Sequence, residues 1–177
     1  MSAPSKILIC GAAEAGKKIL VQNILNFQDR NESKTDHVFS EIRTQSNFIT
    51  YTLPITTKYF STEVQLWLKK SGGAFLGSEV PDDAIKNCDC IILVFDASNP
   101  ASFDAAVVGW GEFVDRHEPT TLLCIANKID IASESYHRQR ESVYIEWCMD
   151  HGFEFIEANC LRPFEGVFPP LFPRYTC

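Results

Sequence analysis

The sequence lacks an uninterrupted apolar run of roughly 18 residues, the length a helix needs to cross a bilayer, so we expect no integral membrane insertion. It also lacks an excess of positive charge. Its 16 lysines and arginines stand against 23 aspartates and glutamates, for a formal net charge of −7. Attraction to phosphate groups supplies most of the affinity of nucleic-acid-binding proteins. An acidic chain of 177 residues without a basic stripe is therefore predicted not to bind nucleic acid.

The cysteines do not form the pattern of a disulfide framework. There are seven, an odd number, and they are scattered through apolar stretches of the sequence. Such usage is typical of reduced thiols. The first residues are polar and lack the apolar core of a secretory signal. We therefore expect a cytoplasmic protein.

Apolar runs of strand length alternate with helical stretches along the chain. The predicted strands cover residues 6–10, 47–53, 62–68, 90–95, 122–126 and 153–157, and the predicted helices cover residues 17–27, 100–117 and 133–151. Residues 90–95 are apolar throughout, which is typical of a central parallel strand covered on both faces. Residues 47–53 and 62–68 alternate apolar and polar side chains and predict an antiparallel pair. The pattern predicts an α/β fold: a doubly wound, mostly parallel six-stranded sheet with helices on both faces and one antiparallel edge pair.

Short-range signals mark the helix ends and the domain limits. Asn99 is expected to cap the second helix with Pro100 at its first position, and Gly152 is expected to end the third helix. Residues 1–160 are predicted to form one domain. Residues 161–177 hold four prolines and four aromatic residues, so we expect an irregular Pro/Phe-rich tail in place of a final helix.

A loop of small residues, GAAEAGKK (11–18), lies between the first predicted strand and the first predicted helix. It matches the phosphate-binding pattern G-x-x-x-x-G-K-[ST] at every constrained position except the last. Glycines let backbone N–H groups turn around a phosphate, and Lys17 would reach the outer phosphates. The last position should carry a hydroxyl that ligates Mg²⁺, but Lys18 stands there, and its ammonium would repel a cation and neutralise part of the phosphate charge itself. The expected phosphate-binding residues are Gly11, Glu14, Ala15, Gly16, Lys17 and Lys18.

The motif N-K-x-D (127–130) directly follows the predicted strand 122–126. The carboxylate of Asp130 would accept two hydrogen bonds from the N–H edge of guanine, which adenine does not present. Asn127 would bond the other edge and the stem of Lys128 would lie along the ring, while the segment Glu-Ala-Asn-Cys after the last predicted strand would add a backbone contact near its asparagine. Ligands of doubly wound sheets bind outside the carboxyl ends of the strands, so these segments predict a GTP or GDP site. The expected guanine-binding residues are Asn127, Lys128, Asp130 and Asn159.

The parts of a GTP-hydrolysing site that hold the metal and the attacking water are missing. The chain contains no Asp-x-x-Gly, and Leu68 stands about where that Asp is expected after the third strand. No Gln follows to orient a water, and the switch threonine is not assigned, because Thr35 and Thr44 are both possible. We therefore expect no Mg²⁺ site, no catalytic residue and negligible hydrolysis. Asp96 is an alternative metal carboxylate, although a strand-end residue that caps a turn is the favoured interpretation.

These landmarks resemble those of small GTPases of the Ras and Rab type, as does the stretch CIILVFDASNPASF (90–103). Two further stretches resemble the alpha- and gamma-adaptin-binding protein family, Rab-like proteins with degenerate nucleotide motifs: ITTKYFSTEV (55–64) and IEWCMDHGFEFIE (145–157). The second is the more specific, because it is a Glu-Trp-Cys-x-x-His helix end running into the last strand. In keeping much of the phosphate loop and of N-K-x-D, the chain resembles the plant-type members.

The resemblance implies a small-GTPase-type fold over about residues 6–159 and a GTPase-like protein-interaction module. It implies a cytosolic chaperone that binds adaptin subunits during assembly of clathrin adaptor complexes, in vesicle-mediated transport. An active Rab-like GTPase switch is the alternative, and a P-loop phosphotransferase is disfavoured because kinases rarely need a guanine reader. The sequence leaves open whether nucleotide is bound at all, which adaptor subunit is contacted and whether the domain forms homo-oligomers.

Overall fold

The computed structural model describes residues 5–31, 40–43, 48–56, 61–70, 88–110 and 121–161. The expectations for the tail beyond Leu161, and for Thr35 and Thr44, lie outside these residues. Within the described helices, none is long and apolar enough to cross a membrane.

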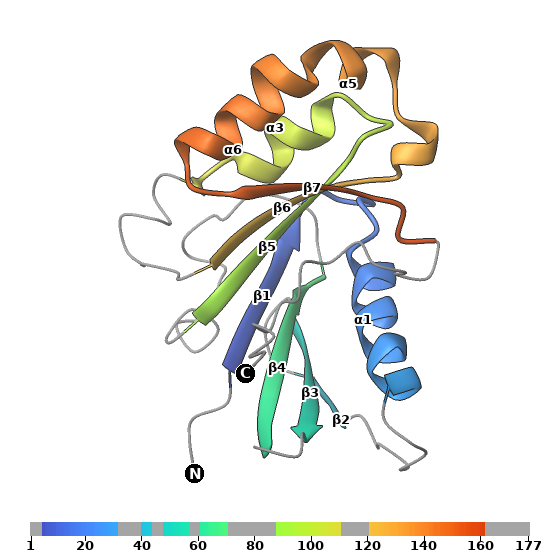
Figure 1. Ribbon diagram of the computed structural model, residues 1–177, viewed down its shortest axis with the longest axis vertical. Coiled ribbons are helices and arrows are strands. Elements are labelled where there is room, and N and C mark those ends of the chain that lie inside the picture. Colours follow the sequence, from blue (N-terminus) through green and yellow to red (C-terminus); the bar gives the residue numbers. More distant parts are fainter. Residues whose placement is uncertain are drawn as a thin grey trace, which may run out of the picture.

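A seven-stranded sheet forms the middle of the molecule, as Figure 1 shows. Its strands in spatial order are β2 (Ser40–Arg43), β3 (Phe48–Thr56), β4 (Ser61–Lys69), β1 (Ser5–Gly11), β5 (Cys88–Asp96), β6 (Thr121–Asn127) and β7 (Glu154–Ala158). The five strands from β4 to β7 run parallel, and β3 runs antiparallel to both of its neighbours. The α/β class, the mostly parallel sheet and the predicted antiparallel pair are confirmed.

The six strands expected from the sequence are joined by a seventh, β2, at the edge of the sheet. It pairs four residues with β3, from Ser40 opposite Thr52 to Arg43 opposite Ile49. Its sequence, SEIR, contains no apolar run. An edge strand has one neighbour and often carries charged residues. Its pairing with that neighbour, and not an apolar pattern in its own sequence, therefore makes it a strand.

The central strands bury their side chains on both faces. In β5, every residue from Cys90 to Asp96 is buried, and the apolar residues of β1 and residues 123–126 of β6 are buried on either side of it. A parallel strand covered by helices on both faces needs such a continuous apolar run. The apolar stretch 90–95 therefore carries enough information to place its strand at the centre.

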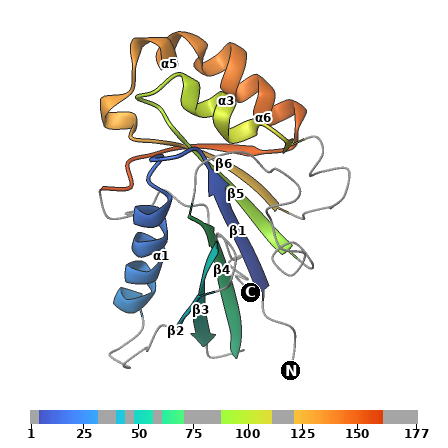
Figure 2. The ribbon, with the colours of Figure 1, turned by 180° about the vertical axis from the view of Figure 1, so that it is seen from behind.

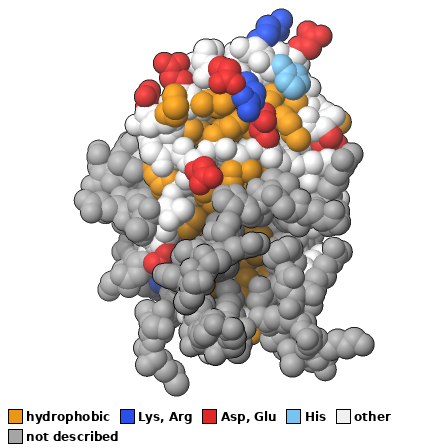
Figure 3. All heavy atoms as spheres, viewed as in Figure 1, with side chains coloured by type: hydrophobic (Ala, Val, Ile, Leu, Met, Phe, Trp, Pro, Cys, Tyr) orange, Lys and Arg blue, Asp and Glu red, His pale blue; other side chains and the backbone are white. Residues whose placement is uncertain are grey.

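The helices lie on opposite sides of the sheet. Helix α1 (Lys17–Asn31) packs against β1 and β4, whereas α3 (Ala101–Val107), α5 (Glu134–Gln139) and α6 (Glu146–Asp150) are grouped over β5 to β7 in both ribbon views (Figures 1 and 2). On the face seen in Figure 3, the described Lys and Arg side chains over this helical layer are scattered among acidic and apolar ones.

The side chain of Asn99 bonds to the start of α3 as predicted, but the helix begins at Ala101, one residue later than expected, and it is shorter than expected. Asn99 Oδ1 accepts a hydrogen bond from the backbone N–H of Ala101 at 3.2 Å, and Pro100 has helical dihedral angles (φ −56°, ψ −35°). The predicted helix 100–117 is interrupted because Val108 is extended (ψ 128°) and Gly109 has a φ of 82°. A glycine in the left-handed region ends a helix, and here it lies in the middle of the predicted one.

The long helix predicted over residues 133–151 is confirmed, with one irregular segment. Ser133 Oγ accepts a hydrogen bond from the N–H of Tyr136 at 3.1 Å, and Gly152 follows the last turn with a φ of 74°. Between α5 and α6, residues Arg140–Ile145 form a π-helical segment. Such wider turns are rare in proteins, and many of those that occur lie near functional sites.

Aromatic side chains hold the α3 and α6 layer onto the sheet. The ring of Phe95 in β5 lies 5.1 Å from Phe103 in α3 and 5.2 Å from Tyr144, and Phe103 meets Trp147 of α6 at 5.6 Å. Offset and edge-to-face pairs at these distances add to the free energy of apolar burial. The described cysteines are buried free thiols, as expected: Cys10, Cys88, Cys90, Cys124, Cys148 and Cys160.

Candidate nucleotide-binding site

The phosphate-type loop leaves β1 through a glycine that no other residue can replace without a shift in structure. Gly11 has a φ of 131°, and a Cβ built on it would lie 1.9 Å from the carbonyl oxygen of Val94 in β5. The same oxygen accepts a hydrogen bond from Ala12 N at 3.1 Å. The loop is therefore held directly against the central strand, at the carboxyl end where ligands of this fold class bind.

The loop ends in a second glycine under similar constraint. Gly16 has a φ of 90°, and a Cβ on it would lie 2.3 Å from the side-chain nitrogen of Asn127. Its carbonyl oxygen accepts a hydrogen bond from Leu20 N at 3.0 Å, which begins α1. Glu14 also has a positive φ, 56°. Both ends of the loop thus leave room for backbone alone, and its N–H groups lead into the positive end of a helix.

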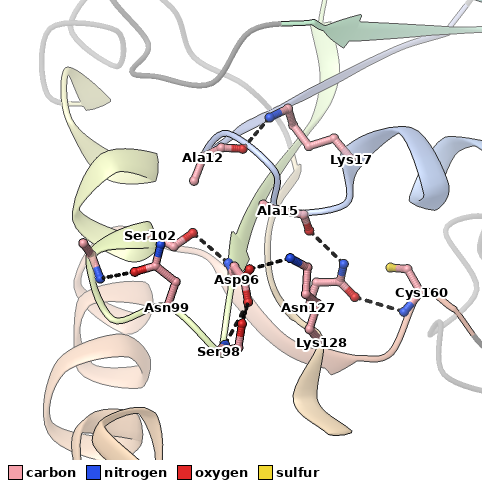
Figure 4. Close-up of polar contacts among 11 residues, drawn as sticks. Ala12, Ala15, Lys17, Asp96, Ser98, Asn99, Ser102, Asn127, Lys128 and Cys160 are labelled. Carbon is pink, nitrogen blue, oxygen red and sulfur yellow. Dashed lines mark hydrogen bonds and ion pairs between the residues drawn. The ribbon is translucent and has the colours of Figure 1, made fainter. Parts of the chain in front are cut away.

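Lys17 lies over the loop, as Figure 4 shows, and only 6% of it is exposed. Its Nζ donates to the carbonyl oxygens of Gly11 at 3.0 Å and Ala12 at 2.5 Å. Burial lowers the pKa of Lys17; the nearby Cys10 opposes this shift and the positive charge of Lys69 adds to it. The lysine expected to reach phosphates is therefore placed at the loop by two of its three N–H donors.

Asn127 joins the three segments that the sequence predicted to meet. It is 3% exposed, and its Nδ2 donates to the carbonyl oxygen of Ala15 at 2.8 Å while its Oδ1 accepts from Cys160 N at 2.9 Å (Figure 4). Asn23 of α1 also donates to the carbonyl oxygen of Cys160. The phosphate-type loop, the N-K-x-D turn and the loop after β7 therefore lie side by side at one edge of the sheet.

The other members of the N-K-x-D turn present polar groups beside Asn127. Asp130 is exposed in a 3₁₀ turn at Ile129–Ile131, and Lys128 adopts a left-handed conformation with a φ of 62°. Asn159 follows Ala158, which pairs with Asn127 in the sheet, and its Oδ1 accepts a hydrogen bond from Leu161 N at 3.0 Å. An exposed carboxylate at this place can accept hydrogen bonds from the N–H groups of a base. The guanine-binding role of Asp130 therefore stays a prediction.

Asp96 caps the turn at the end of β5, in the role favoured from the sequence. Its Oδ1 accepts from Ser98 N at 2.8 Å and from Ser98 Oγ at 2.6 Å, and its Oδ2 accepts from Lys128 Nζ at 2.5 Å. Burial raises the pKa of Asp96, but the hydrogen bonds from Lys128 and Ser98 outweigh it and leave the pKa below its usual value. The pairing of Asp96 with Lys128 was not predicted from the sequence. It follows from the register of β5 and β6, which places Asp96 opposite Asn127, the residue before Lys128.

Glu157 links β7 to the helical layer. It accepts hydrogen bonds from Tyr136 Oη at 2.6 Å and from Arg140 through Nε at 2.7 Å and Nη2 at 3.1 Å. The hydrogen bonds from Arg140 lower the pKa of Glu157 despite its partial burial. Arg140 comes from the π-helical segment, so that irregular segment is tied to β7, the strand that leads into the loop with Asn159.

A cavity of about 330 Å³ opens between the phosphate-type loop, the start of α1 and the ends of β3 and β4. Four lysines line it, namely Lys17, Lys18, Lys69 and Lys70. Leu68 also lines it, buried at the end of β4 opposite Ile9 of β1. The role of Lys69 and Lys70 was missed from the sequence, where their only signal is their place directly after Leu68.

The described residues of this cavity do not fit Mg²⁺. Magnesium binds oxygen ligands in an octahedral arrangement, and neither Lys18 nor Leu68 supplies an oxygen from its side chain. Glu14 is the single carboxylate among the described lining residues. Nowhere in the described ranges do three or more His, Cys, Asp or Glu side chains gather to hold a metal.

Comparison with family models shows the family of the chain. A family model described as the Ras family matches residues 6–163, which is most of the chain. The chain belongs to the Ras family. Membership of this family suggests guanine-nucleotide binding in general terms.

Named relatives of this Ras-family domain belong to several groups. It is 27% identical over 164 residues to Ras-related protein Rab-7b of Paramecium octaurelia, covering 87% of this chain and 71% of that protein. It is 24% identical over 170 residues to Intraflagellar transport protein 27 of Chlamydomonas reinhardtii, covering 93% and 79%.

The resemblance to adaptin-binding proteins is confirmed by similarity to the alpha- and gamma-adaptin-binding protein p34. The domain is 24% identical over 150 residues to that protein from Pongo abelii, and the match covers 85% of this chain. It spans only 41% of the length of p34, so the rest of p34 has no counterpart in the match.

Proposed function

We propose that this Ras-family domain binds guanine nucleotide between its phosphate-type loop and its N-K-x-D turn, without hydrolysing GTP, and serves as a protein-interaction module. The observation that carries the proposal is the Asn127 amide, whose two hydrogen bonds bring the three loops together at 2.8 and 2.9 Å. A buried amide that pairs with two separate loops preorganises the edge of a binding site.

The residues of the loops fit a nucleotide at both ends. The backbone from Gly11 to Gly16 and the Nζ of Lys17 would hold the phosphates, since glycine conformations and a helix N-terminus favour anions. The exposed Asp130 would accept the N–H groups of guanine, with Lys128 and Asn159 beside the base. The nucleotide supplies no chemistry of its own in this proposal; it orders the loops that a partner would contact.

Hydrolysis is not expected because positions 18 and 68 carry no oxygen ligand for a metal and no Gln occurs in residues 69–87 to orient a water. Lys18 and Leu68 occupy the positions of the two expected ligands, and both line the cavity beside Lys17. Phosphoryl transfer depends almost entirely on positioned charge and metal. An active Rab-like switch is the second candidate, favoured by the similarity to Rab-7b.

We assign adaptin subunits of clathrin adaptor complexes as the partners, in a cytosolic chaperone role during vesicle-coat assembly. Support comes from the printed name of the relative p34 and from the two matching stretches of sequence described above. Because the match spans less than half of p34, we expect only the contacts that the Ras-family region of p34 would make with an adaptin subunit. Co-elution of the full chain with recombinant alpha- or gamma-adaptin tests this, and failure to form a complex with either would refute it.

Thermal melting with GTP, GDP or ATP tests the nucleotide proposal. A ligand at 100 times its dissociation constant should add about 2.7 kcal/mol to the free energy of unfolding. We expect a shift with guanine nucleotides, none with ATP, and loss of the shift in Asp130→Ala. Asp104→Ala, which removes an exposed acid from α3, is the matched control. Phosphate release that disappears in Lys17→Ala would instead support the active switch.

A further inference from the structure

The charged end of Lys128 is bound to Asp96, across the ends of two neighbouring strands. Lys128 directly follows β6, and its Nζ lies 2.5 Å from Oδ2 of Asp96, the last residue of β5 (Figure 4). The register of the sheet places Asp96 opposite Asn127, the residue that contacts the phosphate-type loop. The ion pair therefore lies at the carboxyl edge of the sheet, where ligands of doubly wound sheets bind.

The surroundings of Asp96 hold its carboxylate in one orientation. Its Oδ1 accepts hydrogen bonds from Ser98 N at 2.8 Å and Ser98 Oγ at 2.6 Å, and its backbone N–H donates to Ser102 Oγ at 2.8 Å. The side chain of Asp96 is 10% exposed and that of Lys128 is 30% exposed. Because water screens such a pair less than it screens a pair on the open surface, the attraction between the two side chains is stronger than that of an exposed ion pair.

The backbone of the same turn is fixed as well. Ala97 N donates to the carbonyl oxygen of Asn127 at 2.9 Å, and Ser133 N donates to the carbonyl oxygen of Ala97 at 3.0 Å. A lysine side chain has several rotatable bonds, and ordering it on binding a ligand costs conformational entropy that weakens the binding. Here the backbone of Lys128 and its ammonium group are both held before a ligand arrives.

We propose that Asp96 is a positioning residue for the base: by holding the ammonium group of Lys128, it fixes the aliphatic stem along which the guanine ring would lie. This inference rests on the proposed nucleotide-binding function. Asp96 acts on the base and not on the phosphates, which the loop of residues 11–16 and Lys17 would hold. Loss of the ion pair should therefore weaken the binding of guanine nucleotides and leave the binding of pyrophosphate unchanged.

Titration of the full chain with fluorescently labelled GDP, and calorimetric titration with inorganic pyrophosphate, test the inference. Asp96→Asn replaces Oδ2 with an NH₂ group, to which Lys128 cannot donate, while the remaining oxygen can still accept from Ser98. We expect the affinity for GDP to fall about 3- to 10-fold, the cost of ordering one long side chain, and the affinity for pyrophosphate to change by less than about 2-fold. Asp89→Asn, the same substitution at the exposed other end of β5, is the matched control and should change neither affinity.

A second variant tests the same ion pair from its other partner. Lys128→Met keeps an unbranched apolar stem but removes the ammonium group, so it should lose GDP affinity by a factor similar to that of Asp96→Asn. This prediction stands even if Asp96→Asn does not fold, and circular dichroism of each variant verifies the fold.

The double variant separates a positioning role of Asp96 from a structural one. If Asp96 acts through Lys128, then Asp96→Asn should have no further effect on GDP affinity in the Lys128→Met background. An equal further loss in that background, a parallel loss of pyrophosphate affinity, or an unchanged GDP affinity in either single variant would overturn the inference and leave the nucleotide site standing. Failure of the parent protein to bind GDP would refute both proposals.

Discussion

Replacing Asn127 with alanine should destabilise the domain strongly even with no ligand present. The substitution leaves the carbonyl oxygen of Ala15 and the N–H of Cys160 without partners in places where both residues are buried. A buried polar group that loses its partner costs about 1–3 kcal/mol, so the expected loss for the two groups together is about 2–6 kcal/mol. That is a large part of the typical 5–15 kcal/mol of a domain and, at about 2–4 °C per kcal/mol, corresponds to a fall of roughly 4–24 °C in Tm.

Urea unfolding in nucleotide-free buffer measures this loss. Asn159→Ala is the matched control, because its side chain makes a hydrogen bond to Leu161 in an exposed setting, and it should cost less than about 0.5 kcal/mol. A loss in Asn127→Ala no larger than that of the control would refute the reasoning that this amide joins the three loops.

The isosteric variant Asn127→Asp separates the two hydrogen bonds. Its carboxylate still accepts from Cys160 N but places an oxygen where an N–H donates to Ala15, so it should be destabilised at neutral pH. Burial and the facing carbonyl raise the pKa of such a carboxyl, and a group with a raised folded-state pKa stabilises the fold only while it is protonated. The deficit relative to the parent protein should therefore shrink as the pH falls, and a deficit independent of pH would contradict this geometry.

Three further perturbations test other parts of the site. Gly11→Ala should lower the free energy of unfolding by about 4 kcal/mol or more, because the new Cβ would lie 1.9 Å from a backbone oxygen. Gly152→Ala, also at positive φ but with open space around it, is the control and should cost about 1–2 kcal/mol. Equal losses of stability in urea unfolding would contradict the close approach at Gly11. Glu157→Gln should lower the free energy of unfolding by about 1–2 kcal/mol at pH values above 4.5, the ordinary pKa of a glutamate, because Glu157 is then ionised and paired with Arg140. The pKa of Glu157 in the folded protein is lowered, so the difference between the variant and the parent should vanish as the pH falls through that folded-state pKa. A constant difference across a pH series of melts would exclude the ion pair. The affinity for pyrophosphate should begin to fall at a lower pH than it would if Lys17 had the ordinary pKa of a lysine, because the pKa of Lys17 is lowered and its positive charge is lost sooner as the pH rises. Lys17→Arg should remove that fall, because an arginine stays charged. An unchanged pH profile in the arginine variant would refute the role of the Lys17 charge.

Much of the fold follows from local sequence. The apolar run 90–95 predicts a buried parallel strand because only a strand covered on both faces tolerates such a run, and Asn99, Ser133 and Gly152 mark helix ends through their own backbone preferences. The order of strands and helices was predictable for the same reason. These features depend on residues that are neighbours along the chain.

Other features depended on partners that local sequence does not reveal. The edge strand β2 has no apolar pattern and exists through its pairing with β3. The interruption of the predicted helix 100–117 at Gly109 was not anticipated, because glycine inside a helical pattern is often tolerated. The burial of Lys69 was equally invisible, since it arises only where the end of β4 meets the phosphate-type loop.

By itself the sequence determined the class of fold and the residue types of the three loops, because periodicity, glycines and short motifs are local properties. Only the tertiary structure decided that these loops lie side by side. The hydrogen bonds of Asn127 reach across 112 positions to Ala15 and 33 positions to Cys160. Contacts between residues so far apart form only when the sheet has brought the strand ends together, and the same packing places the four lysines around one cavity.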